Sequence, residues 1–279
     1  MTDATTPSPG PAEQHRPALR KSPKTPKKKP ETFADRYLPD GWEYVLPMAV
    51  FLLLIWVGGF GDYWYVASYA TRAVLCLVII GLLWKRYTRI SWSHWKLGVV
   101  VGVVGLVQWV GMESLLVIAR DNTTGVLHLL LNWTSMASPA DAFRPDELFQ
   151  NPAALWAFFA IRLFGAVVTV PIMEELFWRD WLWRTLASPN GFRRFPVGGY
   201  DREAFWLVPV FFAFVHVQLL TAVVWALLIA WLLVKTRSIG ACIIAHAVTN
   251  LLLGLYVIAF GYIWPSDDPL AEARVWYFW

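Results

Sequence analysis

The sequence contains very little cysteine: Cys76 and Cys242 are its only two, and each lies within an apolar stretch. This excludes a disulfide framework of the kind that holds small secreted domains together, and we expect both thiols to be small buried apolar groups. The chain also lacks the His-Glu-x-x-His zinc-binding pattern. It lacks the alternating apolar and polar segments of transmembrane barrels. Many transporters have two halves related by internal symmetry, and this sequence shows no such symmetry.

Long apolar runs are abundant instead, and hydrophobic residues make up 57% of the chain. Several runs approach the ~20 residues that a helix needs to cross a bilayer. They cover approximately Val45–Phe60, Val66–Trp84, Leu97–Ala119, Ala153–Leu186, Phe205–Val217, Leu219–Val234 and Ile239–Ile263. The sequence therefore predicts an all-α polytopic membrane protein, with about seven transmembrane helices around an intramembrane polar cavity. Dividing the long Ala153–Leu186 run, where Pro171 is expected to produce a kink, would give about eight.

The first 36 residues have a different composition, rich in Pro, Thr and Lys. Because they contain few apolar residues, we expect residues 1–36 to form a disordered basic tail, followed by a single transmembrane domain over residues 37–279. We expect the basic cluster of the tail to contact anionic lipids rather than nucleic acid. Basic residues between the predicted spans place the N-terminus in the cytoplasm by the positive-inside rule. They are Lys85, Arg86, Arg89, Lys96, Arg193, Arg194, Arg202, Lys235 and Arg237.

A hexapeptide at the end of an apolar run, Glu174 to Arg179, carries three ionisable side chains. A charged residue at the centre of a membrane helix costs about 2.5–3.5 kcal/mol on insertion scales, so such groups usually pair and mark function. Glu175 and Arg179 are spaced i,i+4 with the acid first, the favourable order for an ion pair. Glu174 is then left without a local partner, as a general base or metal ligand would be.

Two later histidines complete a candidate site. His216 follows Phe212 by one helical turn, and Asn250 follows His246 by one turn, so each pair shares a helix face. With Glu174 they could form a hydrolytic centre, in which the carboxylate deprotonates a water and the imidazoles orient it or hold a metal. The amide of Asn250 would donate to an oxyanion. Taken alone, a histidine in an apolar helix is more often structural than catalytic, and an asparagine there can simply hold two helices together.

Three motifs occur in order: Glu-Glu-x-x-x-Arg at Glu174, Phe-x-x-x-His at Phe212, and His-x-x-x-Asn at His246. In this the chain resembles the CAAX protease and bacteriocin-processing (CPBP) family of intramembrane endopeptidases. The resemblance covers about Ala153–Leu255, a catalytic core at residues 153–255, and implies cleavage of membrane-anchored protein or peptide substrates. It implies these roles: Glu174 activates water, His216 and Asn250 stabilise the oxyanion, His246 positions the water or a metal, and Glu175 and Arg179 support the site.

The resemblance leaves the cofactor open. Zinc, if bound, would be held by Glu174, His216 and His246, whereas a metal-free glutamate-dependent mechanism would use the same residues. The similarity is closest to bacterial members, so we expect an integral protein of the bacterial cytoplasmic membrane. It extends to a CAAX-protease-related branch found beside exosortase-type sorting systems, whose substrates need not be prenylated.

Two other functions compete with proteolysis. A non-proteolytic member of the same fold could act as a scaffold or immunity factor, although such a protein should have lost at least one site residue. A proton-coupled transporter could use the acidic pair and the histidines as relay groups. Arg72 and Arg162 are two further charged residues within apolar runs. We expect Arg72 to reach the membrane interface from a span end. We expect Arg162 to pair with Glu113 across helices, with a substrate carboxylate as its alternative partner.

Overall fold

The computed structural model describes Met1, residues 38–135, Ser138 and residues 142–278. The chain divides into two units, Met1–Asp40 and Gly41–Trp279, and all the described helices belong to the second unit. Residues 2–37, and with them nearly all of the predicted basic tail, lie outside the described residues. The disorder of that tail and its contact with lipid therefore stay predictions.

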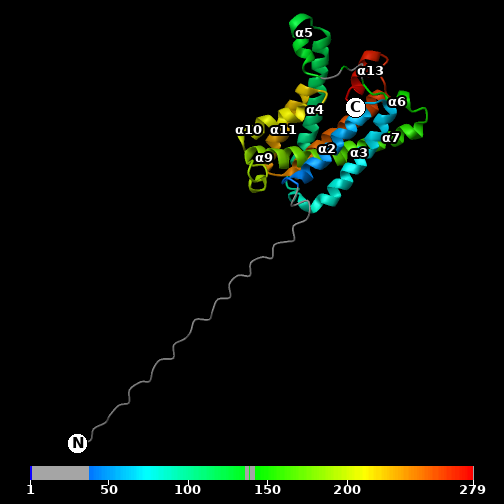
Figure 1. The fold of residues 1–279 in the computed structure, drawn as a ribbon. Helices are drawn as coiled ribbons and strands as arrows, with labels where there is room; N and C mark the ends of the chain where they lie inside the picture. The colour runs from blue at the N-terminus through cyan, green and yellow to red at the C-terminus, as the bar shows by residue number, and fades with distance from the viewer. Residues whose placement is uncertain (2–37, 136–137, 139–141, 279) are drawn as a thin grey trace. The chain divides into compact units, whose positions relative to one another are not determined.

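The second unit is helical, and its described residues include no strand (Figure 1). Its α-helices are α2 Trp42–Gly58, α3 Asp62–Leu83, α4 Trp95–Asp121, α5 Gly125–Asn132, α6 Pro145–Leu148, α7 Pro152–Phe164, α8 Val170–Glu174, α9 Trp183–Ala187, α10 Arg202–Ala213, α11 Leu219–Thr236, α12 Ile239–Val257 and α13 Pro269–Trp276. The π-helical segments are η3 Gly165–Thr169, η4 Glu175–Leu182 and η6 Ile258–Ile263, and short 3₁₀ turns are η1 Trp84–Arg86 and η5 Phe192–Arg194.

Five helical segments of the described chain are long and apolar enough to cross a membrane: Asp62–Arg86, Trp95–Asp121, Pro152–Ala187, Leu219–Thr236 and Ile239–Ile263. The predicted all-α membrane fold is confirmed. The predicted count of seven also needs two shorter helices. One is α2, an apolar helix of 17 residues, and the other is α10, with 12 residues. The fifth predicted run, Phe205–Val217, is short because α10 ends at Ala213, and the chain turns before α11 begins at Leu219.

The long segment Pro152–Ala187 is one continuous helix that widens around Pro171. In the π-helical turn before it, the N–H of Val170 donates to the carbonyl of Gly165, five residues earlier. The next donor in that register would be residue 171, and proline has no N–H to give to Ala166. The side chain of Asn250 supplies the missing donor, with its Nδ2 2.8 Å from the carbonyl oxygen of Ala166. The proline therefore creates an acceptor that α12 fills.

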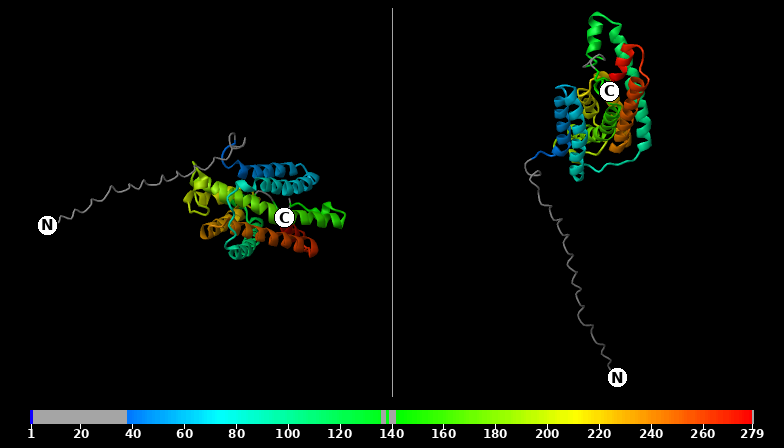
Figure 2. Two further views of the ribbon diagram at one scale, coloured as in Figure 1. Left: turned by 90° about the horizontal axis from the view of Figure 1, so that it is seen from below. Right: turned by 90° about the vertical axis from the view of Figure 1, so that its right-hand side faces the viewer.

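Helices α4 and α12 pack closely because glycines lie where they meet (Figure 2). A Cβ atom on Gly98 would lie 2.5 Å from the carbonyl oxygen of Ala241, and one on Gly102 would lie 2.7 Å from that of Ala245. Small residues four apart let two membrane helices approach to backbone contact. Thr249 uses this approach, since its hydroxyl donates to the carbonyl of Gly102 at 2.9 Å. The contact fixes the position of α12, which carries two of the predicted site residues.

Helix α3 is tied to the long helix by hydrogen bonds from side chains to backbone. The hydroxyl of Thr169 donates to the carbonyl of Ala73 at 2.8 Å, and that of Tyr69 donates to the carbonyl of Arg162 at 3.0 Å. Both acceptors are helical carbonyls in an apolar surrounding, where such a bond replaces a missing contact with water. The α2–α3 hairpin is thereby attached along the helix that carries Glu174 and Glu175 (Figure 1).

We expect Gly102→Ala to lower the thermal unfolding temperature, because the new methyl group overlaps the backbone of α12, and overpacking costs about 1–3 kcal/mol. The matched control is Gly111→Ala on the same helix, where a Cβ meets no atom within 4 Å. Alanine is the better helix former by about 1 kcal/mol, so this control should be neutral or stabilising. Unfolding of both variants in the same detergent tests the pair; equal effects would contradict the close α4–α12 contact.

Candidate active site

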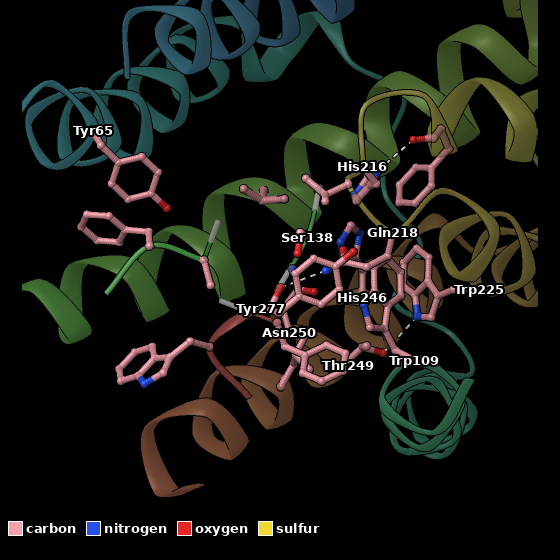
Figure 3. A pocket seen from close by; sticks show the side chains of 18 residues that line it. Tyr65, Trp109, Ser138, His216, Gln218, Trp225, His246, Thr249, Asn250 and Tyr277 are labelled. Atoms are coloured by element: carbon pink, nitrogen blue, oxygen red, sulfur yellow. Dashed lines mark hydrogen bonds between the residues drawn. The ribbon is translucent and has the colours of Figure 1, made fainter. Parts of the chain in front are cut away.

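A cavity of about 410 Å³ lies between α4, the turn before α11, α12 and residues 276–278 (Figure 3). Both predicted histidines, His216 and His246, line it, and so does Asn250. Figure 3 shows these side chains near one another, together with Trp225, while Tyr65 lies at the opposite end of the cavity. The structure therefore brings together polar groups from α12 and from the turn before α11 at one end of an otherwise largely apolar space.

Glu175 is the centre of a buried charge cluster. One carboxylate oxygen, Oε1, accepts from Nη1 of Arg179 at 3.1 Å and from Nδ1 of His246 at 2.9 Å. The i,i+4 pair expected from the sequence is thus present, and it has a third member from α12. Glu175 is 0% and Arg179 1% exposed, so neither charge has access to water. The second oxygen of Glu175 and Nη2 of Arg179 have no hydrogen-bond partner among the described residues.

His216 is held by the helix that precedes it. Its Nδ1 lies 2.8 Å from the carbonyl oxygen of Phe212, and its ring stacks on that of Phe212 with centroids 4.2 Å apart. The guanidinium of Arg179 lies over the same Phe212 ring, 4.6 Å from its centroid. The ring of Phe212 therefore lies between Arg179 and His216 and contacts both. These contacts are a physical reason for a phenylalanine one turn before His216.

These contacts determine which ring nitrogens are available. A carbonyl or a carboxylate only accepts, so a neutral His216 or His246 carries its proton on Nδ1. Nε2 of each ring is then a free acceptor on a residue that lines the cavity. Two such acceptors can orient a water molecule. His216 can donate from Nε2 to an oxyanion only as the imidazolium.

Glu174 lies on the same helix face as Val170, which lines the cavity, and one turn further along α8. Its side chain is buried rather than facing lipid, and its Oε2 has no hydrogen-bond partner among the described residues. Glu174 itself is not among the residues that line the cavity. A buried carboxylate oxygen without a partner is costly unless a water or substrate group supplies one.

The donor set for zinc does not fit this arrangement. No group of three His, Cys, Asp or Glu side chains in the described part of the chain is placed to hold a metal ion. Glu174, His216 and His246, the ligands expected if zinc were bound, do not form such a group. The mechanism proposed below therefore uses these side chains without a metal ion.

Residues 155–252 match the family model described as type II CAAX prenyl endopeptidase Rce1-like. The chain carries an Rce1-like domain. This domain covers about a third of the 279 residues, contains all three motifs, and confirms the recognition of the CPBP family. Comparisons with curated proteins and with solved structures give no match. The proposed exosortase-associated branch stays a prediction.

Trp225 contacts the Rce1-like site, although nothing in the sequence indicates that it does. Trp225 stacks on Phe212 at 5.3 Å and meets the ring of His246 edge-on at 4.7 Å. Its indole N–H donates to the hydroxyl of Thr249 at 3.3 Å. Trp225 lies within the apolar run of α11, and a sequence rich in tryptophan gives no reason to choose this one. Its role is decided by the packing of α11 against α12.

The predicted pair between Arg162 and Glu113 is wrong. Glu113 is fully buried and forms an ion pair with Arg120 on its own helix. Its other oxygen accepts from the hydroxyl of Thr221 at 2.6 Å. Arg162 instead donates to the hydroxyl of Tyr65. Arg120 lies two helical turns after Glu113 on α4, so it reaches the carboxylate without crossing to another helix.

We expect the neighbouring variants Glu175→Gln and Glu174→Gln to differ in their effect on stability. Glu175→Gln leaves the buried Arg179 without its carboxylate, a loss of about 3–5 kcal/mol for a broken buried pair. Glu174→Gln removes no hydrogen bond to a described residue, so its unfolding temperature should stay near that of the wild type. Thermal unfolding of both purified variants measures this; a greater loss in Glu174→Gln would refute the assignment of Glu175 as the structural member.

Proposed function

We propose that this protein is an intramembrane endopeptidase that hydrolyses peptide bonds of membrane-anchored protein substrates. The observation that carries the proposal is the presence of His216, from the turn after α10, and His246, from α12, on the wall of one cavity with each Nδ1 anchored. The Rce1-like match over residues 155–252 supports endopeptidase activity in general. The apolar lining suits a substrate held within the bilayer.

Glu174 acts as the general base in the proposed reaction. Its carboxylate takes a proton from a water molecule, whose remaining hydrogen donates to Nε2 of His246. The water oxygen attacks the scissile carbonyl, and the proton then passes from Glu174 to the leaving amine. The buried, unpartnered Oε2 of Glu174 supports this role, because its free acceptor position matches the proton that it must receive.

His216 and Asn250 stabilise the oxyanion in this mechanism. His216 does so as the imidazolium, since its Nδ1 already donates to Phe212 and only a second proton makes Nε2 a donor. One N–H of the Asn250 amide donates to Ala166, and the second remains for the substrate. The Asn250 amide is a donor fixed before the reaction and costs no reorganisation when charge develops, whereas His216 must first take up a proton.

Glu175 and Arg179 are positioning residues. Glu175 orients the ring of His246, and Arg179 neutralises Glu175 while it contacts the face of Phe212. The protein is an integral membrane protein, with apolar helices long enough to span a bilayer. We propose the bacterial cytoplasmic membrane as its location, because the resemblance is closest to bacterial members of the family. The distribution of basic residues favours an N-terminus in the cytoplasm.

The peptidase proposal is tested by comparing membrane fractions of cells that carry the wild-type protein or Glu174→Gln. We expect at least one membrane protein to change in mass only with the wild type, and the variant to lose this cleavage by at least ~100-fold, as for a missing general base. Glu203→Gln is the matched control, since this glutamate is exposed at the start of α10.

Cleavage that continues in Glu174→Gln would remove the base from the mechanism. If no protein changes in mass with the wild type either, the proteolytic function itself is wrong. Capture of an uncut membrane protein by both forms would then favour the scaffold function, and proton-driven solute uptake would favour the transporter.

The metal question is tested by elemental analysis of the purified protein. Because the described residues offer no group of three ligands, we expect no stoichiometric zinc, and the same metal content in wild type and His216→Ala. Activity should also survive dialysis against a chelator. One zinc per chain that is lost in His216→Ala would overturn the metal-free mechanism.

A further inference from the structure

Arg72 is a buried cation for which the described residues supply no polar partner. It is the eleventh of the 22 residues of α3 and only 6% exposed, so the expectation that it reaches the interface from a span end is wrong. Its Nε is buried without a hydrogen bond, and no ion pair joins it to any described residue. Instead, aromatic rings surround the guanidinium: Tyr69 at 4.4 Å, Phe51 at 5.2 Å and Tyr65 at 5.9 Å from its Cζ.

Aromatic contacts do not account for this burial. A guanidinium presents five N–H donors and stays charged in proteins. Ring faces attract the charge but accept none of those hydrogen bonds in good geometry. A buried charge is ordinarily paired or bonded to an anion. The described residues therefore leave the guanidinium of Arg72 without a hydrogen-bond acceptor.

A second cation lies beside the same rings. The Cζ atom of Arg162 is 4.9 Å from the ring centroid of Tyr69 and 5.8 Å from that of Tyr65. Two guanidiniums that share a pair of tyrosines repel each other in an apolar medium. An anion between them would offset that repulsion and supply the acceptor that Arg72 lacks. Arginine suits this task because its fork binds a carboxylate through two parallel hydrogen bonds.

Arg162 lines a space beside the proposed catalytic cavity, and Arg72 is linked to it through the two tyrosine rings that both arginines contact. A smaller cavity of about 150 Å³ is lined by Tyr69 and Arg162, and also by Asn250, Leu253 and Phe278, which line the large cavity too. Tyr65 lines the large cavity and contacts both guanidiniums. Figure 3 places Tyr65 at the opposite end of the cavity from His216. A molecule that extends from the histidines along the cavity therefore ends at Tyr65, whose ring contacts both guanidiniums.

We propose that Arg72 and Arg162 form an anion subsite that binds a carboxylate of the peptide substrate. The inference rests on the proposed function for the identity of the ligand. Depth favours a peptide over a lipid phosphate, because Arg72 lies ~15 Å along α3 from either helix end, where headgroups would be. Fixing a carboxylate at one end of the cavity determines which peptide bond reaches the histidines at the other end.

The test measures binding in a protein that does not cleave, the full chain with Glu174→Gln in phosphatidylcholine nanodiscs. The probes are dansyl-Leu-Val-Leu with a free carboxylate and the same peptide as its C-terminal amide. Energy transfer from Trp109, Trp225 and Trp276, which line the cavity, to the dansyl group reports occupancy. We expect the free acid to bind at least ~10-fold more tightly than the amide, a tenfold change being about 1.4 kcal/mol.

Adding Arg72→Met should reduce that preference to less than ~2-fold and leave the affinity for the amide unchanged, since the apolar wall is kept. Arg162→Gln should also reduce the preference, and serves if Arg72→Met does not fold. The matched control is Arg89→Met, an exposed arginine outside the cavity, which should keep the full preference. Equal binding of acid and amide before mutation, or a preference that survives both variants, overturns the subsite.

Nanodiscs that contain phosphatidylglycerol distinguish the source of the anion. If this lipid displaces the acid peptide, and Arg72→Met abolishes the displacement, then the site binds a lipid phosphate and the assignment to substrate is wrong. Because Glu174→Gln separates binding from cleavage, the two proposals can fail independently. A carboxylate preference without cleavage by the wild type would support the subsite and refute the peptidase function. Cleavage without a carboxylate preference would support the peptidase function and refute the subsite.

Discussion

The carboxylate of Glu175 is the interaction on which this site depends. Through one oxygen it holds Arg179 of its own helix and His246 of α12, and all three side chains are buried. In an apolar interior neither charge can exchange its partner for water, so the loss of one leaves the other uncompensated. The pair therefore does more than neutralise charge in the membrane, because it fixes the orientation of the His246 imidazole, for which we propose a catalytic role, relative to the helix that carries Glu174.

Backbone features reinforce the same junction between the long helix and α12. Pro171 leaves the carbonyl of Ala166 without a donor in the π-helical register, and Asn250 donates to it. On the other side of α12, the glycines of α4 permit contact with its backbone. An unsatisfied carbonyl is costly in a bilayer, so each of these contacts is strongly favoured over separation of the helices. Asn250 can thus act in the site only because the proline has already placed it there.

Much of the helical pattern could be predicted from hydropathy. The predicted run Leu219–Val234 is the helix Leu219–Thr236, and Ile239–Ile263 is reproduced as predicted. The prediction was weaker where local propensity and tertiary contact compete. The run Phe205–Val217 is helical only as far as Ala213, and hydropathy gives no sign of the π-helical turns on either side of Pro171. The choice of partner for Glu113 failed because several cations were available and only packing selects among them.

By itself, the sequence determined the apolar helices, the i,i+4 ion pair of Glu175 and the order of three polar motifs. These follow from composition and from the periodicity of a single helix. Only the tertiary structure decided that His246 meets Glu175, that Trp225 packs against both motif rings, and that Arg72 is enclosed by aromatic groups. Such contacts join residues far apart in the chain, and their partners are chosen by helix packing, which no spacing within one helix encodes.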